Sequence, residues 1–244
     1  VGVGAVDAGT VALSSATSGA LRVIVPDTPG RVPDGLWAYR VSRRESIVGG
    51  ALNDVGRVVT WLERTLAPVE PAARDAALSA TPKAGTPLVL PFLTGERATG
   101  WAGKARAEFS GITAATTALD IWRGAIEGVA VSYARIFDQL ASIDSGITRV
   151  VASAGVTRHF PAVLEVLCNA LGTSICVITT ERMTMRGTAI LALKGLDPAL
   201  ECVPVPDAGL HTPDGAQAGY YAELRARFEG LYAQVIGGTD ARTA

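Results

Sequence analysis

The sequence has little charge, few aromatic residues and no long apolar run. Charged residues make up 18% of the 244 residues and the formal net charge is −1. No basic surface therefore supports binding to nucleic acid or to an anionic membrane. The richest apolar run, residues 125–134, contains Glu127 and is flanked by Arg123 and Arg135, which excludes it as a membrane span. A hydrophobic fraction of 48% excludes a disordered chain.

Cysteine and histidine are also scarce. The three cysteines, Cys168, Cys176 and Cys202, are odd in number and lack the spacing of metal ligands. Cys168 falls in a helical pattern and Cys176 in a strand pattern, which predicts buried free thiols in a reducing compartment, the cytoplasm. His159 and His211 are the only histidines, so we predict no metal site built on histidine. No signal peptide is recognisable, and because Val1 lies within an apolar, glycine-containing pattern, we expect a piece of a longer polypeptide.

The segment Leu13–Val23 predicts a β-hairpin. Apolar residues alternate on both sides of a turn that holds Thr17, Ser18 and Gly19. Two hydroxyls and several uncrowded backbone amides suit a phosphate oxyanion. The alternative is that these small residues only close the hairpin.

Helical and strand patterns alternate further along the chain. Apolar spacing predicts a helix over residues 55–66, capped by Asn53 or Asp54. A longer apolar stripe after a Thr117/Asp120 capping box predicts a helix that ends near residue 143, with Glu127 on a solvated flank. Strands first, then helices and strands in alternation, predict an α/β fold in which helices cover both faces of a mixed sheet.

Three further segments allow two interpretations each. Gly49 and Gly50, in a strand predicted to break at this pair, indicate either tight packing or close approach to a ligand. Glu96 and Arg97, after an apolar strand, indicate either ligand contacts or a surface ion pair. The strand, turn and helix over residues 149–171 are typical of an anion or nucleotide site.

Residues 109–127 carry the most specific pattern. Phe109-x-Gly111-Ile112, seven residues, and then Asp120-Ile121-x-x-Gly124-Ala125-Ile126-Glu127 resembles the second signature of the FGGY carbohydrate kinases. Gly124 stands where that family prefers Ala or Ser. Other segments follow in the family's order as far as about Val235: Gly4–Gly9, Thr17–Arg22, Val48–Asn53 with Trp61–Leu62, Leu90–Arg97, Ala152–Gly155 and Arg186–Ala189.

The resemblance implies a C-terminal domain over residues 1–236, with a frayed tail at 237–244. It implies the actin-like ATPase fold, a ribonuclease-H-like unit. In the family, ATP with Mg²⁺ binds between two such domains, and the sugar lies deeper in the cleft. By analogy, the residues that contact the nucleotide are Thr17, Ser18, Gly19, Gly56, Thr60, Gly155 and His159.

The family's catalytic aspartate precedes the segment that Val1 begins. We therefore predict no catalytic residue here, do not assign that role to Asp54 or Glu96, and expect this chain alone to be inactive. The implied function is an ATP-dependent kinase that transfers the γ-phosphate to a sugar or sugar-acid hydroxyl, of the gluconate or xylulose type. The substrate would be held through the N-terminal sugar-binding domain, and a homodimer is possible in this family.

Two departures from the family pattern motivate an alternative. Ala16 and Ala154 replace glycines that are common in the family, and at a positive φ each alanine would cost about 1 kcal/mol or more. The alternative is a non-catalytic domain for nucleotide sensing or partner binding. A third reading is an actin-like ATPase with another substrate, such as an acetate-type kinase.

Overall fold

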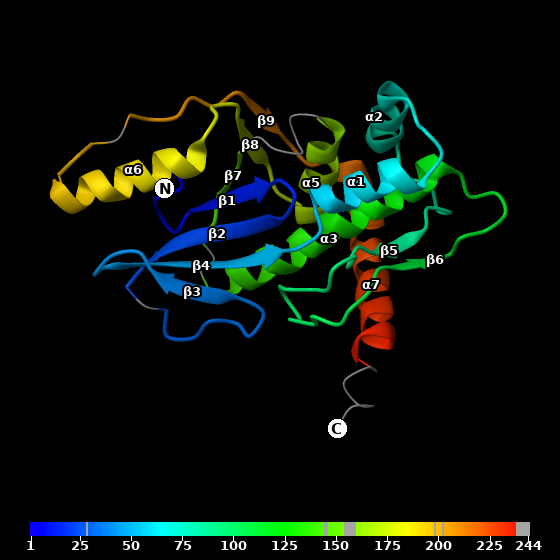
Figure 1. Cartoon of the computed structure of the whole chain (residues 1–244), viewed down its shortest axis with the longest axis horizontal. Coiled ribbons are helices and arrows are strands. Elements are labelled where there is room, and N and C mark those ends of the chain that lie inside the picture. The colour runs from blue at the N-terminus through cyan, green and yellow to red at the C-terminus, as the bar shows by residue number, and fades with distance from the viewer. Residues whose placement is uncertain (28, 144–145, 154–159, 198, 202, 238–244) are drawn as a thin grey trace.

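The structure is a computed structural model, and it describes residues 1–27, 29–143, 146–153, 160–197, 199–201 and 203–237. Within this part of the chain, a seven-stranded mixed sheet has the strand order β3-β4-β2-β1-β7-β8-β9 (Figure 1). Its strands are β1 Thr10–Ser15, β2 Gly19–Pro26, β3 Trp37–Arg40, β4 Glu45–Leu52, β7 Arg149–Ser153, β8 Ile175–Ile178 and β9 Gly209–His211. A small second sheet pairs β5 Leu88–Leu90 with β6 Glu108–Ser110. The predicted mixed sheet is confirmed.

The sheet combines an antiparallel half with a parallel half. The predicted hairpin is β1 with β2, and β4 and β3 extend it in antiparallel register. On the other side of β1, β7 and then β8 run parallel to it, with Ser14 opposite Ser153. The carboxyl ends of β1, β7 and β8 therefore meet at one edge of the sheet, which is where open α/β sheets place their ligands.

Helices cover both faces of the sheet, as predicted. The α-helices of the described residues are α1 Gly56–Thr65, α2 Pro71–Ser79, α3 Ala118–Ile143, α5 Ala162–Leu171, α6 Met183–Leu196 and α7 Ala218–Val235. One face, with Val11, Leu13 and Leu21, belongs to the main core together with apolar residues of α3 and α5. The opposite face packs Val151 and Ile178 against Met183 of α6 in a smaller cluster.

Strand β4 differs from its prediction. It runs without a break through Gly49 and Gly50, and both glycines serve packing. A Cβ at Gly49 would lie 2.5 Å from the carbonyl oxygen of Leu21, and one at Gly50 would lie 2.9 Å from two side-chain carbons of Ile136. Tight packing is the interpretation that the structure supports.

The long helix α3 confirms the predicted helix and its capping box. Its start is fixed by Thr117 and Asp120, because Thr117 N donates to Asp120 Oδ2 at 2.9 Å and Asp120 N donates to Thr117 Oγ1 at 3.3 Å. The helix ends at Ile143. Its C-terminal half lies against the sheet (Figure 1), and its buried side chains include Tyr133 and Ile136.

Glu127 of α3 is fully buried, so the prediction of a solvated flank is wrong. The reason is tertiary: α7 covers this part of α3, and Tyr220 Oη donates to Glu127 Oε2 at 2.8 Å. Arg123 Nε donates to Glu127 Oε1, also at 2.8 Å. Burial raises the pKa of Glu127, while Arg123 and Tyr220 oppose that rise.

Arg123 also terminates α2. Its Nη1 donates to the carbonyl oxygens of Ala77, Leu78 and Ala80 at 2.6–3.2 Å. The last carbonyls of a helix have no hydrogen-bond donor within the helix. At the end of α2, the Arg123 guanidinium is that donor. The buried pair of Arg123 and Glu127 thereby joins α2, α3 and α7 in one network.

Two glycines let α3 approach β5 closely. A Cβ at Gly124 would lie 2.2 Å from the carbonyl oxygen of Pro87, and one at Gly128 would lie 2.2 Å from that of Val89. Real Cβ atoms do not come so close to backbone, so a larger residue forces the elements apart. The packing of α3 against β5 in this chain therefore leaves room only for glycine at position 124.

We expect Gly124→Ala to lower the free energy of unfolding by about 1–3 kcal/mol, because the clash with backbone outweighs the helix propensity of alanine. The matched control is Gly230→Ala in the exposed part of α7, where no atom lies within 4 Å of the added Cβ. There alanine is expected to add up to about 1 kcal/mol. Urea denaturation measures both, and equal effects of the two changes would contradict this account of the packing.

Candidate functional site

The candidate site is the turn between β1 and β2, at the sheet edge where the parallel strands end. Ala16 N donates to Ser18 O at 2.9 Å, which closes the turn. Thr17 and Ser18 are exposed. Two residues that carry hydroxyls are thus open to solvent on a turn closed by a backbone hydrogen bond, an arrangement that suits an oxyanion.

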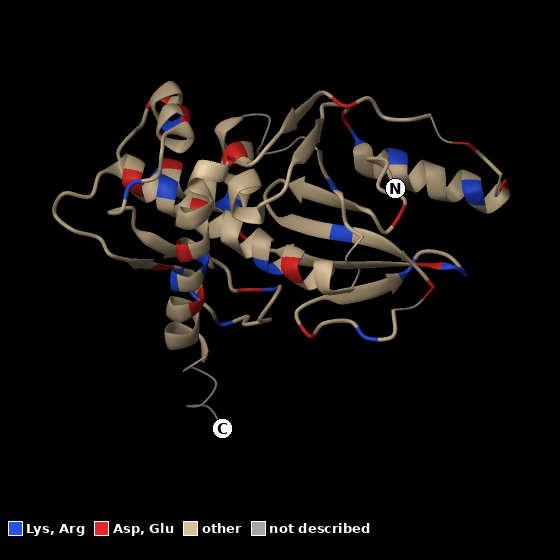
Figure 2. Cartoon of the chain, turned by 180° about the vertical axis from the view of Figure 1, so that it is seen from behind, with Lys and Arg blue, Asp and Glu red and all other residues tan. Residues whose placement is uncertain are grey.

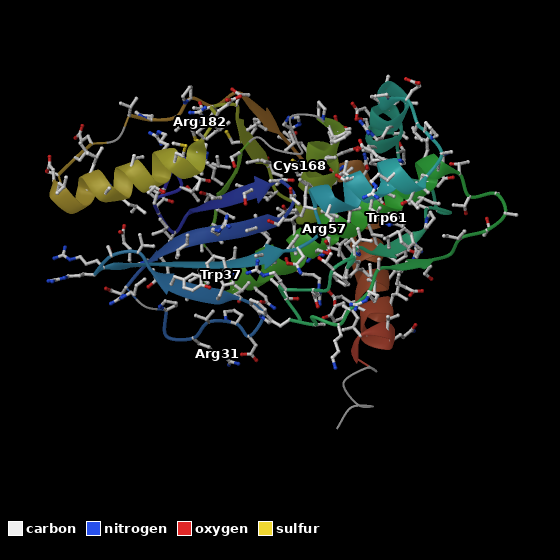
Figure 3. The ribbon with its side chains drawn as sticks, viewed as in Figure 1. Arg31, Trp37, Arg57, Trp61, Cys168 and Arg182 are labelled. Atoms are coloured by element: carbon white, nitrogen blue, oxygen red, sulfur yellow. The ribbon has the colours of Figure 1, made fainter. Side chains whose placement is uncertain are left out.

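The carbonyls of this turn cap the first amides of α1. Gly56 N donates to Ala16 O at 2.8 Å, and Arg57 N donates to Thr17 O at 3.2 Å. The predicted cap by Asn53 or Asp54 is wrong, since α1 has no side-chain cap and begins after Val55. These contacts place Gly56 directly beside the turn, and Arg57 lies next to the end of the hairpin (Figure 3).

Asn53 and Asp54 instead fasten the loop after β5. Asp54 is buried and accepts hydrogen bonds from Thr94 N at 2.8 Å and Thr94 Oγ1 at 2.9 Å. It also pairs with Arg57 Nε at 3.0 Å. Asn53 Nδ2 donates to Gly95 O at 3.1 Å. Asp54 is committed to structural contacts, consistent with leaving it out of the catalytic assignment.

Glu96 is also buried, so its interpretation as a surface ion pair is wrong. Arg135 Nη1 donates to its Oε1 at 2.8 Å, and Thr99 N donates to the same oxygen at 3.2 Å. Tyr232 Oη donates to the other oxygen, and burial together with the charge of Glu96 raises the pKa of Tyr232 to about 12. These bonds join the 94–103 loop to α3 and α7, which makes Glu96 a structural residue.

Gly19 has a packing role as well as its place in the turn. An added Cβ would lie 1.9 Å from Tyr133 Oη and 2.8 Å from Val55 Cγ2. Tyr133 Oη donates to Ser14 O at 2.8 Å, and burial raises the pKa of Tyr133 well above its usual range. The hairpin therefore rests on α3 through a hydroxyl that only glycine at position 19 can accommodate. The apolar stripe of α3 predicted that Tyr133 is buried but not this contact.

Ala16 lies outside the positive-φ region. Among the described residues other than glycine, only Asp27, Trp101 and Arg182 have positive φ. The turn therefore carries none of the backbone strain that the replacement of glycine by Ala16 had raised as a possibility. Ala154 lies outside the described residues.

Three residues predicted to contact the nucleotide remain to be placed, namely Thr60, Gly155 and His159. Thr60 is exposed on α1, one turn after Gly56. Gly155 and His159 lie outside the described residues, but β7 ends at Ser153, which pairs with Ser14 three residues before Thr17. The structure thus brings together Thr17, Ser18, Gly19 and Gly56.

We expect Asp54→Asn to lower the free energy of unfolding by about 1–3 kcal/mol. The new amide nitrogen would face the donors of Thr94 or Arg57, and a buried donor would lose its acceptor. The control is Glu223→Gln, an exposed carboxylate on α7, which should change stability by less than about 0.5 kcal/mol. Urea denaturation compares the two, and an equally small effect at Asp54 would contradict its role in fastening the loop.

Known proteins match both the sequence and the fold. Residues 11–196 match the C-terminal domain of the FGGY family of carbohydrate kinases. The chain is 30% identical over 172 residues to gluconokinase of Bacillus subtilis (strain 168), an alignment that covers 65% of this chain and 33% of that kinase. It is also 27% identical over 193 residues to glycerol kinase of Leptothrix cholodnii, covering 74% of this chain and 38% of that kinase.

Solved structures with the same fold include two sugar kinases from Lactobacillus acidophilus. Gluconate kinase has a TM-score of 0.85 at 23% identity and aligns with 96% of this chain and 49% of its own. A ligand-bound xylulose kinase has a TM-score of 0.85 at 23% identity and aligns with 98% and 50%. The predicted actin-like ATPase fold is confirmed, and the chain spans at most about half the length of these relatives. The chain belongs to the FGGY family of carbohydrate kinases, whose C-terminal domain it matches.

Proposed function

We propose that this chain is the nucleotide-binding half of an ATP-dependent kinase for a sugar or sugar acid. The observation that carries the proposal is the 16–18 turn. The carbonyl oxygens of this turn accept hydrogen bonds from the first backbone amides of α1. Thr17 and Ser18, which carry hydroxyls, are exposed at the sheet edge where the parallel strands end. Gluconokinase and glycerol kinase are among the relatives that support it.

The turn fits the phosphate end of a nucleotide. Phosphoryl transfer depends mainly on positioning and on stabilising charge, and hydroxyl and amide donors on a fixed backbone supply both. ATP would provide the γ-phosphoryl group and Mg²⁺ would neutralise its oxygens. Thr17 and Ser18 would bind phosphate oxygens, while Gly56 and Thr60 on α1, with Gly155 and His159, would contact the nucleoside.

The Mg²⁺ ion and the general base would both come from outside this site. In the part of the chain that the structure describes, no group of three or more His, Cys, Asp or Glu side chains is placed to hold a metal ion. Asp54 and Glu96, the two acids left out of the catalytic assignment, are buried and hydrogen-bonded. We therefore propose that Mg²⁺ arrives on the nucleotide, and that the general base and most sugar contacts belong to an N-terminal domain.

We expect a small-molecule substrate for the proposed kinase, and not a membrane lipid or a nucleic acid. Among the described residues, none of the helices has the length and apolar character to cross a bilayer. Basic and acidic residues are interspersed over the helices and loops, while the strands of the main sheet are mostly uncharged (Figure 2). A cytoplasmic location and a homodimeric state stay predictions.

We expect Thr17→Val to weaken the binding of ATP by about tenfold, because a hydrogen bond to a charged phosphate oxygen is lost. Valine keeps the branched shape, so the hairpin should remain folded. The control is Thr65→Val at the exposed end of α1. Calorimetric titration with Mg·ATP measures the affinities, and equal binding by wild type and Thr17→Val would contradict the phosphate site.

We expect the isolated chain to bind nucleotide weakly and to show no kinase turnover, because it supplies no general base. An ADP-release assay with gluconate, xylulose and glycerol tests this directly. Robust phosphorylation of any of them by this chain alone would contradict the division of labour between two domains.

A further inference from the structure

One arginine on the open face of the sheet is held in place without a counter-ion. Cross-strand register aligns Trp37, Gly49, Arg22 and Ala12 in a row across β3, β4, β2 and β1. Leu21 and Val23, the neighbours of Arg22, are buried in the core against α3. Because successive side chains alternate between faces, Arg22 points to the face away from α3.

Gly49 makes room for this arginine. A Cβ at Gly49 would lie 2.9 Å from Trp37 Cη2 and 3.0 Å from Arg22 Cγ. Without it, the guanidinium carbon lies 5.9 Å from the centroid of the Trp37 ring, within reach of a cation–π contact. Arg22 Nη1 also donates to Ser14 Oγ at 3.1 Å. The side chain is therefore oriented before any ligand arrives.

Arginines with little exposed side chain have carboxylate partners in the described part of the chain, whereas Arg186, which is partly buried, donates to backbone carbonyls. Arg123 pairs with Glu127 and Arg135 pairs with Glu96, each at 2.8 Å. Arg22 is partly buried and makes no ion pair with a described residue, and burial lowers its pKa, an effect to which the nearby cation Arg97 adds. A partly desolvated cation is costly unless an anion compensates it, so the surroundings of Arg22 favour binding an anion.

The space beside Arg22 has the character of a polyol site. A groove of about 260 Å³ separates this sheet face from α6 and the N-terminal residues. Arg22 is the only charged side chain among the described residues that line it, and Ser14, Ser153, Thr184 and Thr188 contribute hydroxyls. The volume is below the range of about 300–1,000 Å³ that drug-sized ligands occupy, so the groove fits a compact, hydroxylated ligand.

We propose that Arg22 determines substrate specificity by binding the carboxylate of a sugar acid. This rests on the proposed function and selects sugar acids over neutral sugars as its substrate class. The planar guanidinium presents paired donors that match a carboxylate, and the hydroxyls of the groove match the rest of a polyhydroxylated chain. The phosphates of the nucleotide have their own site at the Thr17 turn, which leaves Arg22 for the substrate.

The test is an NMR titration of the 244-residue chain with sodium gluconate, with sorbitol as the neutral six-carbon control and with sodium phosphate as the inorganic anion. The side-chain NH signals of Arg22 and Trp37 report on the site. Arg22→Gln removes the charge, and Arg31→Gln, an exposed arginine in the loop after β2 (Figure 3), is the matched control for net charge. The same samples are titrated with Mg·ATP.

Gluconate is expected to shift both signals, sorbitol to have no effect, and Arg22→Gln but not Arg31→Gln to weaken gluconate binding at least about tenfold. The inference is overturned if sorbitol binds as well as gluconate, if phosphate binds equally well at the same signals, if Arg22→Gln binds gluconate normally, or if gluconate shifts nothing. In the titration with Mg·ATP, the NMR signals of the Thr17 turn report nucleotide binding. A response to ATP without one to gluconate refutes the role of Arg22 and leaves the proposed function standing, whereas the reverse refutes the nucleotide site.

Discussion

The hydrogen bonds between the 16–18 turn and the start of α1 are the contact on which the site depends. A helix start leaves its first amides without partners, and here the carbonyls of Ala16 and Thr17 provide them. The same bonds stop the turn from moving relative to α1. The candidate phosphate site is therefore a rigid corner between a hairpin and a helix, and not a loose loop.

Buried polar contacts hold that corner to the rest of the molecule. Asp54 connects the start of α1 to the loop after β5, and Glu96 connects that loop to α3 and α7. Arg123 and Glu127 connect α3 to α2 and α7 in the same way. A buried carboxylate is stable only when its oxygens are satisfied, so each one fixes the relative position of the elements that satisfy it. The buried carboxylates of the described chain therefore hold its helices and loops together. This accords with a general base that another part of the kinase supplies.

Arg22 differs from these buried acids, because it is a charged side chain without an oppositely charged partner in the described chain. It lies on a strand, is oriented by Ser14 and Trp37, and has no carboxylate from the described chain. Sequence alone did not single it out, since an arginine in a strand is usually a solvated residue on the polar face. Only the cross-strand register, which places Gly49 between it and Trp37, makes it a defined donor that faces a groove.

Local patterns in the sequence determined the α/β fold class, the hairpin and the long helix α3 with its Thr117/Asp120 capping box. They also determined the family. These features were predictable because alternation, helical spacing and capping are properties of neighbouring residues. Tertiary structure decided the roles of the polar residues. Glu127 lies at the border of an apolar stripe, and whether it meets water or Tyr220 depends on where α7 packs, ninety-three positions along the chain. The cap of α1 likewise comes from carbonyls of another element, whose backbone has no signature in the sequence. The Thr17 turn was predictable as a hairpin from its small residues, but its rigidity and its contact with Gly56 follow only from the folded chain.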